Sequence, residues 1–168
     1  MRFNRTSAAP VEFYRCDSDE EAQQTLSHVF SDLVDKGSFM AADVAIITQR
    51  LPRLSAAYKA RLKGNTRVVR RQSEVPNHAL LSRCHTFKGL EKRVVIVIDL
   101  DDKFVDCTDE ELKSFIYMTF SRFVDKLVIL GCGDAWTRID SLIAPKAAES
   151  HVSPSAQWLE RSVERLNY

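Results

Sequence analysis

The chain is 168 residues long, and its 45% hydrophobic and 28% charged residues are typical of one globular domain that can bury a core. Its 24 Lys and Arg barely exceed its 23 Asp and Glu, which excludes nucleic-acid binding by overall charge and leaves only local contacts. The longest apolar run, residues 94–98, is too short to cross a membrane, and no apolar segment follows the first five residues as in a secretion signal. We therefore expect a cytoplasmic protein without membrane contact.

The strands are indicated by short runs of alternating or continuous apolar residues that are bounded by turn-forming residues. They are predicted at residues 11–15, 44–48, 66–71, 79–84, 94–98 and 127–130. Between them, apolar residues recur at helical spacing, and Ser18 and Thr108 each precede a Glu by three residues, as in a capping box. Helices are predicted over residues 18–37, 52–64 and 108–123, the second with a buried stripe of Leu54, Ala57, Tyr58 and Leu62. This alternation favours an α/β fold, with a mostly parallel sheet covered by helices on both faces.

The chain divides into three predicted parts. Residues 1–10 are expected to be a disordered lead, residues 11–134 the α/β domain, and residues 135–168 an extension. The pattern weakens after Gly133, which we interpret as the end of a turn with no helix behind it. Within the extension, Ser153 and Pro154 suit the start of a short helix that packs on the domain or on a neighbouring one.

Reactive or binding residues are expected beyond the carboxyl ends of the strands, where open α/β sheets hold their ligands. Three loops qualify: Gln49 with Arg50, residues 85–91, and residues 99–102. Arg122 is a fourth candidate, because it emerges from the largely apolar or small residues 115–121 of a predicted helix, where a cation is unusual. The cysteines Cys16, Cys84, Cys107 and Cys132 stand singly, so we expect reduced, mostly buried thiols and no bound metal.

Two segments resemble motifs of the UvrD-like branch of superfamily 1 helicases. Residues 85–91 read His-x-x-Lys-Gly-Leu-Glu before an apolar strand, which is similar to helicase motif V. Residues 117–122 read Tyr-Met-Thr-Phe-Ser-Arg, which is similar to motif VI. One strand, an acidic loop and a capped helix separate the two segments, as in that family. The resemblance covers residues 11–131 and implies a three-layer, RecA-like domain, the second and C-terminal motor domain of such an enzyme.

The resemblance implies a role in ATP hydrolysis. In such helicases ATP and Mg²⁺ bind between two RecA-like domains, the first carrying the phosphate loop and the second supplying an arginine finger. Arg122 matches that finger and is the predicted catalytic residue. The segment from Gly89 to Glu91 is similar to the one that approaches the sugar and terminal phosphate of the nucleotide. The full predicted ATP-binding set is Gln49, Arg50, Gly89, Leu90, Glu91 and Arg122.

The resemblance also implies a single-strand nucleic-acid partner. His85, Thr86 and Lys88 match positions that line the strand track and hold phosphates without reading bases. Single-stranded DNA is the expected ligand, with RNA left open. The other expected partner is an N-terminal RecA-like domain of the same protein.

Some features depart from the family. No G-x-x-x-x-G-K-[ST] loop occurs in the chain, so we expect the missing domain to bind most of the ATP and Mg²⁺, and this chain alone to be inactive. Arg83 stands where the family usually has Thr, and Phe123 where a small residue is common.

Two other functions remain open from the sequence. Asp99 and Asp101, after an apolar strand, resemble the nucleophile loop of haloacid-dehalogenase-type phosphatases, in which the first Asp attacks phosphorus beside Mg²⁺. The absent phosphate loop also allows a non-catalytic RecA-like module that binds nucleic acid or protein. Trp136 and Trp158 are expected to pack rather than to stack on bases, and Arg67, Arg70 and Arg71 to form a solvated strand face.

Overall fold

Six strands form one sheet in the computed structural model, which describes residues 11–62, 64–87, 89–101, 104 and 106–143. The strands are β1 (Val11–Arg15), β2 (Val44–Thr48), β3 (Arg67–Val69), β4 (His78–Arg83), β5 (Lys92–Leu100) and β6 (Phe123–Gly131). Their order across the sheet is β1-β6-β5-β2-β4-β3, and all five neighbouring pairs are parallel. The predicted lead, residues 1–10, and the predicted helix at Ser153 lie outside the described residues.

Helices cover both faces of the sheet. The main ones are α1 (Asp19–Phe30), α2 (Ala56–Lys59), α4 (Asp109–Phe120) and α5 (Gly133–Ile143). A π-helical segment, η1 (Ser31–Asp35), follows α1, and η2 (Ala41–Asp43) and η3 (Pro52–Leu54) are short 3₁₀ helices. The side chains of Ser18 and Thr108 accept hydrogen bonds from the amides of Glu21 and Glu111, so the residues expected to start α1 and α4 cap them.

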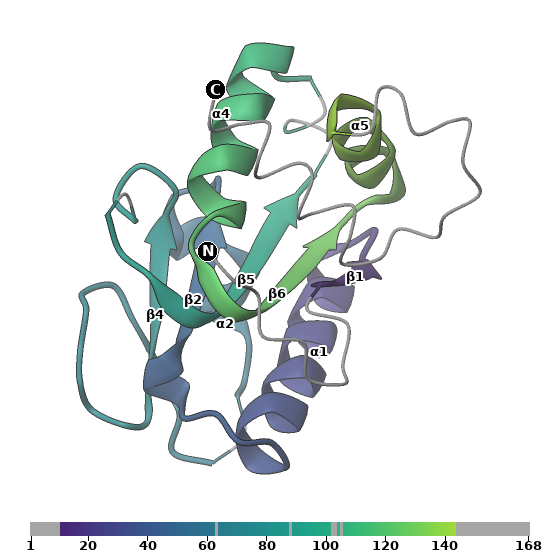
Figure 1. Cartoon of the computed structure of the whole chain (residues 1–168). Coiled ribbons are helices and arrows are strands. Elements are labelled where there is room, and N and C mark those ends of the chain that lie inside the picture. Colours follow the sequence, from purple (N-terminus) through teal and green to yellow (C-terminus); the bar gives the residue numbers. More distant parts are fainter. Residues whose placement is uncertain (1–10, 63, 88, 102–103, 105, 144–168) are drawn as a thin grey trace.

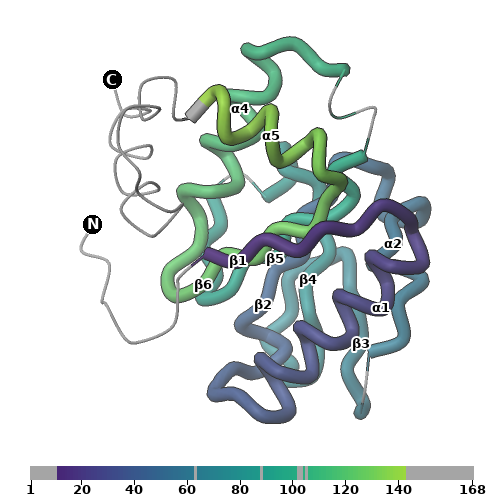
Figure 2. Tube along the Cα trace, turned by 90° about the vertical axis from the view of Figure 1, so that its right-hand side faces the viewer, coloured from purple at the N-terminus to yellow at the C-terminus, as the bar shows by residue number. Residues whose placement is uncertain are grey.

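Two apolar cores separate the layers. On one face, α1 and α2 pack on Ile46, Ile96 and Val128, and on the other face α4 and α5 pack on Val95 and Ile129. Figure 2 shows the strands between these two pairs of helices. The chain therefore has the predicted three-layer α/β fold, which is consistent with a RecA-like domain. Among the described helices, none is long and apolar enough to span a bilayer.

The helix predicted over residues 52–64 is wrong in length, and only half of its predicted buried stripe faces the core. It is broken into η3 and α2, because Ser55 between them has an extended backbone and donates its hydroxyl proton to the buried Asp99. Of the expected stripe, Ala57 is fully buried and Leu62 packs against the core, whereas Leu54 and Tyr58 are each 55% exposed, and Ala56 is buried in addition.

A helix also follows Gly133, where we expected only a turn. Ala135 and Ile139 of α5 are buried in the core that α4 shares. Trp136 stacks on Phe13 of β1, with ring centroids 4.6 Å apart, which confirms the packing role expected for this tryptophan. Figure 1 shows α5 beside α4 after the end of β6.

Candidate functional site

Glu91 and Arg122 lie side by side at the amino edge of the sheet. Glu91 directly precedes β5 and Arg122 directly precedes β6, and the first residues of these strands, Lys92 and Phe123, are register partners. The amide nitrogen of Lys92 donates a hydrogen bond to the carbonyl oxygen of Arg122 at 3.1 Å. The parallel pairing of β5 and β6 therefore brings together the ends of the two motif-like segments.

The guanidinium group of Arg122 has no partner within the described part of the chain. We had expected Arg122 inside a helix. Helix α4 instead ends at Phe120, so Arg122 lies in the turn before β6. Its Nε atom is buried without a hydrogen-bond acceptor, and no described carboxylate forms an ion pair with it. Burying an unpaired N–H costs about 1 to 3 kcal/mol, so this arginine is placed where a ligand or another domain would stabilise it.

Gly89 lies in the segment that leads from β4 to β5. Phe87 anchors this segment, since it is fully buried in the core that α4 covers, and its carbonyl oxygen accepts from the amide of Leu90 at 3.1 Å. Gly89 has a φ of 86°, a left-handed conformation that strains any residue with a Cβ. Apart from Gly89 and its two chain neighbours, no described residue has a heavy atom within 4 Å of the place where a Cβ would be, so the backbone here is open to a ligand.

Arg50 lies at the opposite, carboxyl edge and is held by acidic residues. Its Nη2 atom is 2.7 Å from Oδ2 of Asp101, and its Nη1 atom is 2.8 Å from Oδ1 of Asp19. Burial acts to lower the pKa of Arg50, but the hydrogen bonds to Asp101 and Asp19 and the charge of Asp99 outweigh it and raise the pKa. The positive charge of Arg50 is therefore compensated within the domain.

Gln49 lies close to the residues predicted to contact nucleic acid. The thiol of Cys84, directly before His85, is 3.8 Å from Oε1 of Gln49. His85 and Thr86 are both exposed in the turn that follows β4. Lys88 lies outside the described residues. Gln49, His85 and Thr86 thus share the carboxyl edge of the sheet.

The predicted ATP-binding residues are accordingly divided between the two edges. Strand β5 separates the edges, and its nine residues span about 26 Å at roughly 3.3 Å per residue. Gly89, Leu90, Glu91 and Arg122 lie toward its start. Gln49 and Arg50 lie beyond its end, with Asp101. The structure brings together the first group but not the whole set.

Arg83 is a candidate that the motif comparison treated only as a departure. It is the register partner of Thr48 and so ends β4 next to Gln49 and His85. Its Nε atom is buried and has no acceptor among the residues that the structure describes. An Arg directly after the largely apolar residues 79–82 of a predicted strand was the sequence signal for it.

Asp99 is structural rather than exposed. Its Oδ2 atom accepts from the hydroxyls of Thr48 at 2.6 Å and Ser55 at 2.5 Å, and its Oδ1 atom accepts from the amide of Ala56 at 3.1 Å. Its side chain is only 1% exposed. Both oxygens are occupied and shielded, which contradicts a nucleophilic role at phosphorus. Within the described residues no group of three or more His, Cys, Asp or Glu side chains could hold a metal ion.

Comparison with known proteins supports the fold. No protein-family model and no curated protein sequence matches the chain. Among solved structures, it is similar to the C-terminal domain of a possible DNA helicase from Lactobacillus plantarum WCFS1, with a TM-score of 0.57 and 18% sequence identity. The match covers 97% of this chain and 86% of the other one.

Proposed function

We propose that this chain is the C-terminal motor domain of an ATP-dependent, UvrD-like superfamily 1 DNA helicase. One observation carries the proposal: Arg122, whose buried Nε has no acceptor among the described residues, lies beside Glu91 at one edge of the sheet. This is the arrangement expected if motif VI and motif V share a nucleotide. The similarity to a domain described as part of a possible DNA helicase supports the same conclusion.

The amino edge would contribute half of the ATP site. Gly89, Leu90 and Glu91 would approach the sugar and terminal phosphate, and the open left-handed backbone at Gly89 permits close approach. Arg122 would stabilise the charge that develops on the transferring phosphoryl group. The phosphate loop and the Mg²⁺ ligands would come from an N-terminal RecA-like domain. Arg50 is left out of this half-site because Asp19 and Asp101 hold it at the other edge.

The carboxyl edge would hold the nucleic-acid strand. His85, Thr86 and Lys88 are the predicted contacts there, and the position of Gln49 beside Cys84 adds an amide to them. Arg83 adds a cation whose Nε is unpaired within the described chain. Residues 84–91 run from this edge to the amino edge, so a single segment would contact both the strand and ATP.

The alternative is a non-catalytic RecA-like interaction module, which the absent phosphate loop favours. The two functions differ in the protein that contains this domain. A helicase hydrolyses ATP faster when single-stranded DNA is added and separates a duplex, and Arg122→Ala abolishes both activities while DNA binding persists. An interaction module shows neither activity, and its variant behaves as the wild type.

A further inference from the structure

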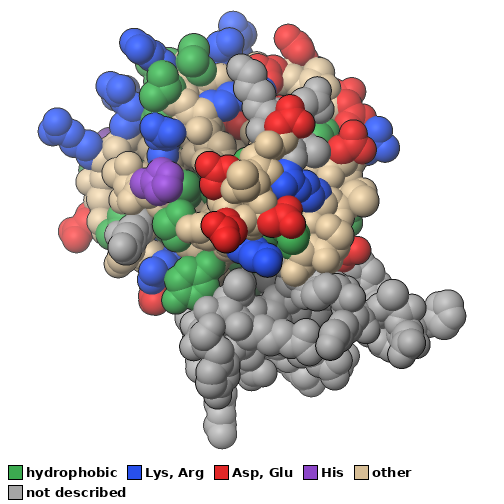
Figure 3. Space-filling model, turned by 90° about the horizontal axis from the view of Figure 1, so that it is seen from above, with side chains coloured by type: hydrophobic (Ala, Val, Ile, Leu, Met, Phe, Trp, Pro, Cys, Tyr) green, Lys and Arg blue, Asp and Glu red, His purple; other side chains and the backbone are tan. Residues whose placement is uncertain are grey.

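Basic residues are concentrated in one stretch of this nearly neutral chain. Residues 44–73, between Asp43 and Glu74, hold 8 of the 24 Lys and Arg and none of the 23 Asp and Glu. Arg50 is compensated by acids from elsewhere. The other described cations of this stretch are exposed and form no ion pair among the described residues: Arg53, Lys59, Arg61, Arg67, Arg70 and Arg71. Figure 3, which faces the carboxyl edge, shows Lys and Arg gathered on its left side.

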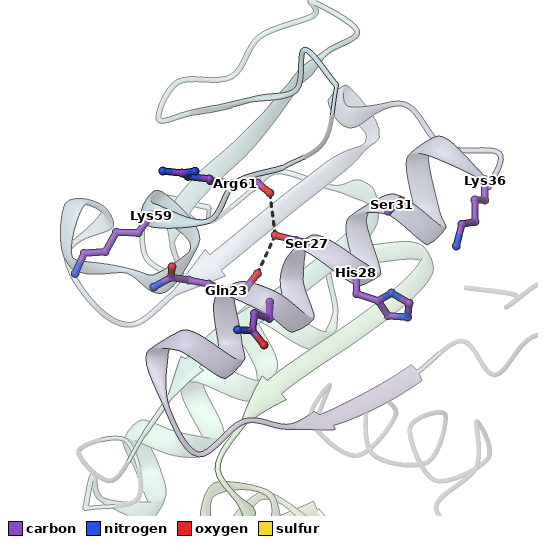
Figure 4. A pocket seen from close by; sticks show the side chains of 8 residues that line it. Gln23, Ser27, His28, Ser31, Lys36, Lys59 and Arg61 are labelled. Carbon is purple, nitrogen blue, oxygen red and sulfur yellow. Dashed lines mark hydrogen bonds between the residues drawn. The ribbon is translucent and has the colours of Figure 1, made fainter.

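Two of these cations line a groove against α1. The groove has a volume of about 490 Å³, with Lys59 and Arg61 on one side and His28 and Lys36 from the α1 side. Figure 4 shows these side chains around it. Asp32 lies 3.2 Å from His28 and 2.8 Å from Lys36, so it offsets the charge on the α1 side. The uncompensated charge of the groove therefore comes from Lys59 and Arg61.

The wall that carries Arg61 is fixed to α1. The hydroxyl oxygen of Ser27 lies 3.0 Å from the carbonyl oxygen of Arg61 and 2.9 Å from that of Gln23. Figure 4 draws both contacts: the one to Arg61 joins α1 to the segment after α2, and the one to Gln23 lies within α1. Since the backbone after α2 is held in place, the groove exists before any ligand binds.

The chemistry of the lining selects one class of ligand. Besides the four basic side chains it consists of two glutamines and two serines, with no apolar and no acidic side chain. Cations, amides and hydroxyls are the groups that contact phosphates and sugars without reading bases. A protein partner would instead bury an apolar or aromatic centre, which this lining does not offer.

We propose that this groove binds the phosphate backbone of single-stranded DNA, as a second contact surface separate from His85 and Thr86. The inference rests on the proposed helicase function, because that function supplies the nucleic acid. Helix α2 connects the two surfaces: it starts after Ser55, which is bonded to Asp99 at the end of β5, and it ends at Lys59 in the groove. A strand that leaves the carboxyl edge can follow α2 into the groove.

The test compares a groove variant with a variant of equal charge change. The double variant Lys59→Ala with Arg61→Ala removes two cations from the groove. Lys113→Glu, at an exposed position of α4 on the other face of the sheet, changes the net charge by the same amount. Binding of a labelled oligothymidylate to the full 168-residue chain is measured by fluorescence anisotropy over a range of salt concentrations. Thermal melting verifies that both variants fold.

The proposal predicts that the groove variant loses at least about tenfold in affinity at low salt. Its slope of log affinity against log salt should fall by about 1.4, since each single-strand phosphate contact contributes about 0.7. Lys113→Glu should leave the slope unchanged. Equal affinities and equal salt slopes of the two variants overturn the groove assignment. The assignment is also overturned if the wild type binds polyglutamate and does not bind DNA. The helicase function itself is tested by a different measurement. It is contradicted if the intact protein with Arg122→Ala hydrolyses ATP at the normal rate.

Discussion

The amide of Lys92 donates a hydrogen bond to the carbonyl oxygen of Arg122, at 3.1 Å, where β5 and β6 begin to pair. This bond links the two motif-like segments through the main chain, so their relative position is set by the sheet and not by flexible side chains. A nucleotide held by Glu91 would therefore meet Arg122 without rearrangement of the domain. The predictions that follow test the parts of this arrangement and the scaffold around it.

Asp99 should be a major stabilising residue. Asp99→Ala leaves the hydroxyls of Thr48 and Ser55 and the amide of Ala56 without their buried acceptor. We expect a loss of about 3 to 5 kcal/mol in the free energy of unfolding, measured by urea denaturation. Asp106→Ala removes an exposed carboxylate and should change stability by less than about 0.5 kcal/mol. A loss for Asp99→Ala no larger than that of the control would contradict the buried network.

Gly89 and Gly64 form a matched pair for separating strain from function. Both have positive φ, 86° and 69°, and beyond the chain neighbours no described residue has a heavy atom within 4 Å of either Cβ position. Each substitution by Ala should therefore destabilise the fold by about 1 to 2 kcal/mol, through backbone strain alone. In the intact ATPase only Gly89→Ala should weaken ATP binding, as measured by calorimetry. Equal ATP affinity of the two variants would argue against a ligand at Gly89.

The four cysteines should differ in reactivity. Burial raises the pKa of the Cys16 and Cys84 thiols, so less thiolate is present at mildly alkaline pH, whereas Cys107 and Cys132 are only half-buried. Alkylation of the native protein, followed by mass spectrometry, should label Cys107 and Cys132 first. The difference should disappear in denaturant. In the native protein, the alkylation rates of Cys16 and Cys84 should increase only at a higher pH than the rate of a free thiol does. Faster labelling of Cys84 than of Cys107 would contradict the packing.

Lys88 is predicted to act on the strand rather than on ATP. Lys88→Ala should weaken single-strand binding and reduce the stimulation of ATP hydrolysis by DNA, while turnover without DNA stays close to normal. Turnover of the intact ATPase, measured with and without DNA, separates the two effects. Thr86→Ala, at an exposed position predicted to line the same track, should act in the same direction. An equal loss of turnover with and without DNA would place Lys88 in the ATP site instead.

Local sequence rules predicted most of the fold because they depend on neighbouring residues. The continuous apolar run of β5 and the capping box at Thr108 are visible in the sequence, and both form as predicted. The prediction of a helix over residues 52–64 failed because Leu54 and Tyr58 have the spacing of a buried stripe but are exposed. Its actual form depends on the contact of Ser55 with Asp99, 44 residues away, which no local pattern contains.

The site was predicted less completely than the fold. Arg122 and Glu91 were identified from motif resemblance, and the register of β5 and β6 accounts for their proximity. The prediction that Arg50 shares an ATP site with Glu91 and Arg122 overlooked the common direction of parallel strands. Arg50 follows a strand and Arg122 precedes one, so the two must lie at opposite edges of a parallel sheet. The acids around Arg50, Asp19 from one part of the chain and Asp99 and Asp101 from another, could not be predicted from spacing.

The central claim is that Arg122 acts on the transition state of ATP hydrolysis, and turnover measured together with ATP affinity in the intact ATPase tests it most directly. Loss of an arginine finger lowers turnover by roughly 10³ to 10⁵, or about 4 to 7 kcal/mol, while ATP binding changes little. Arg122→Ala should show this loss, and Arg122→Lys should be nearly as inactive because an ammonium lacks the planar fork. Arg15→Ala, which removes an exposed Arg paired with Asp17, should retain normal turnover. A turnover loss below about tenfold for Arg122→Ala would contradict the account.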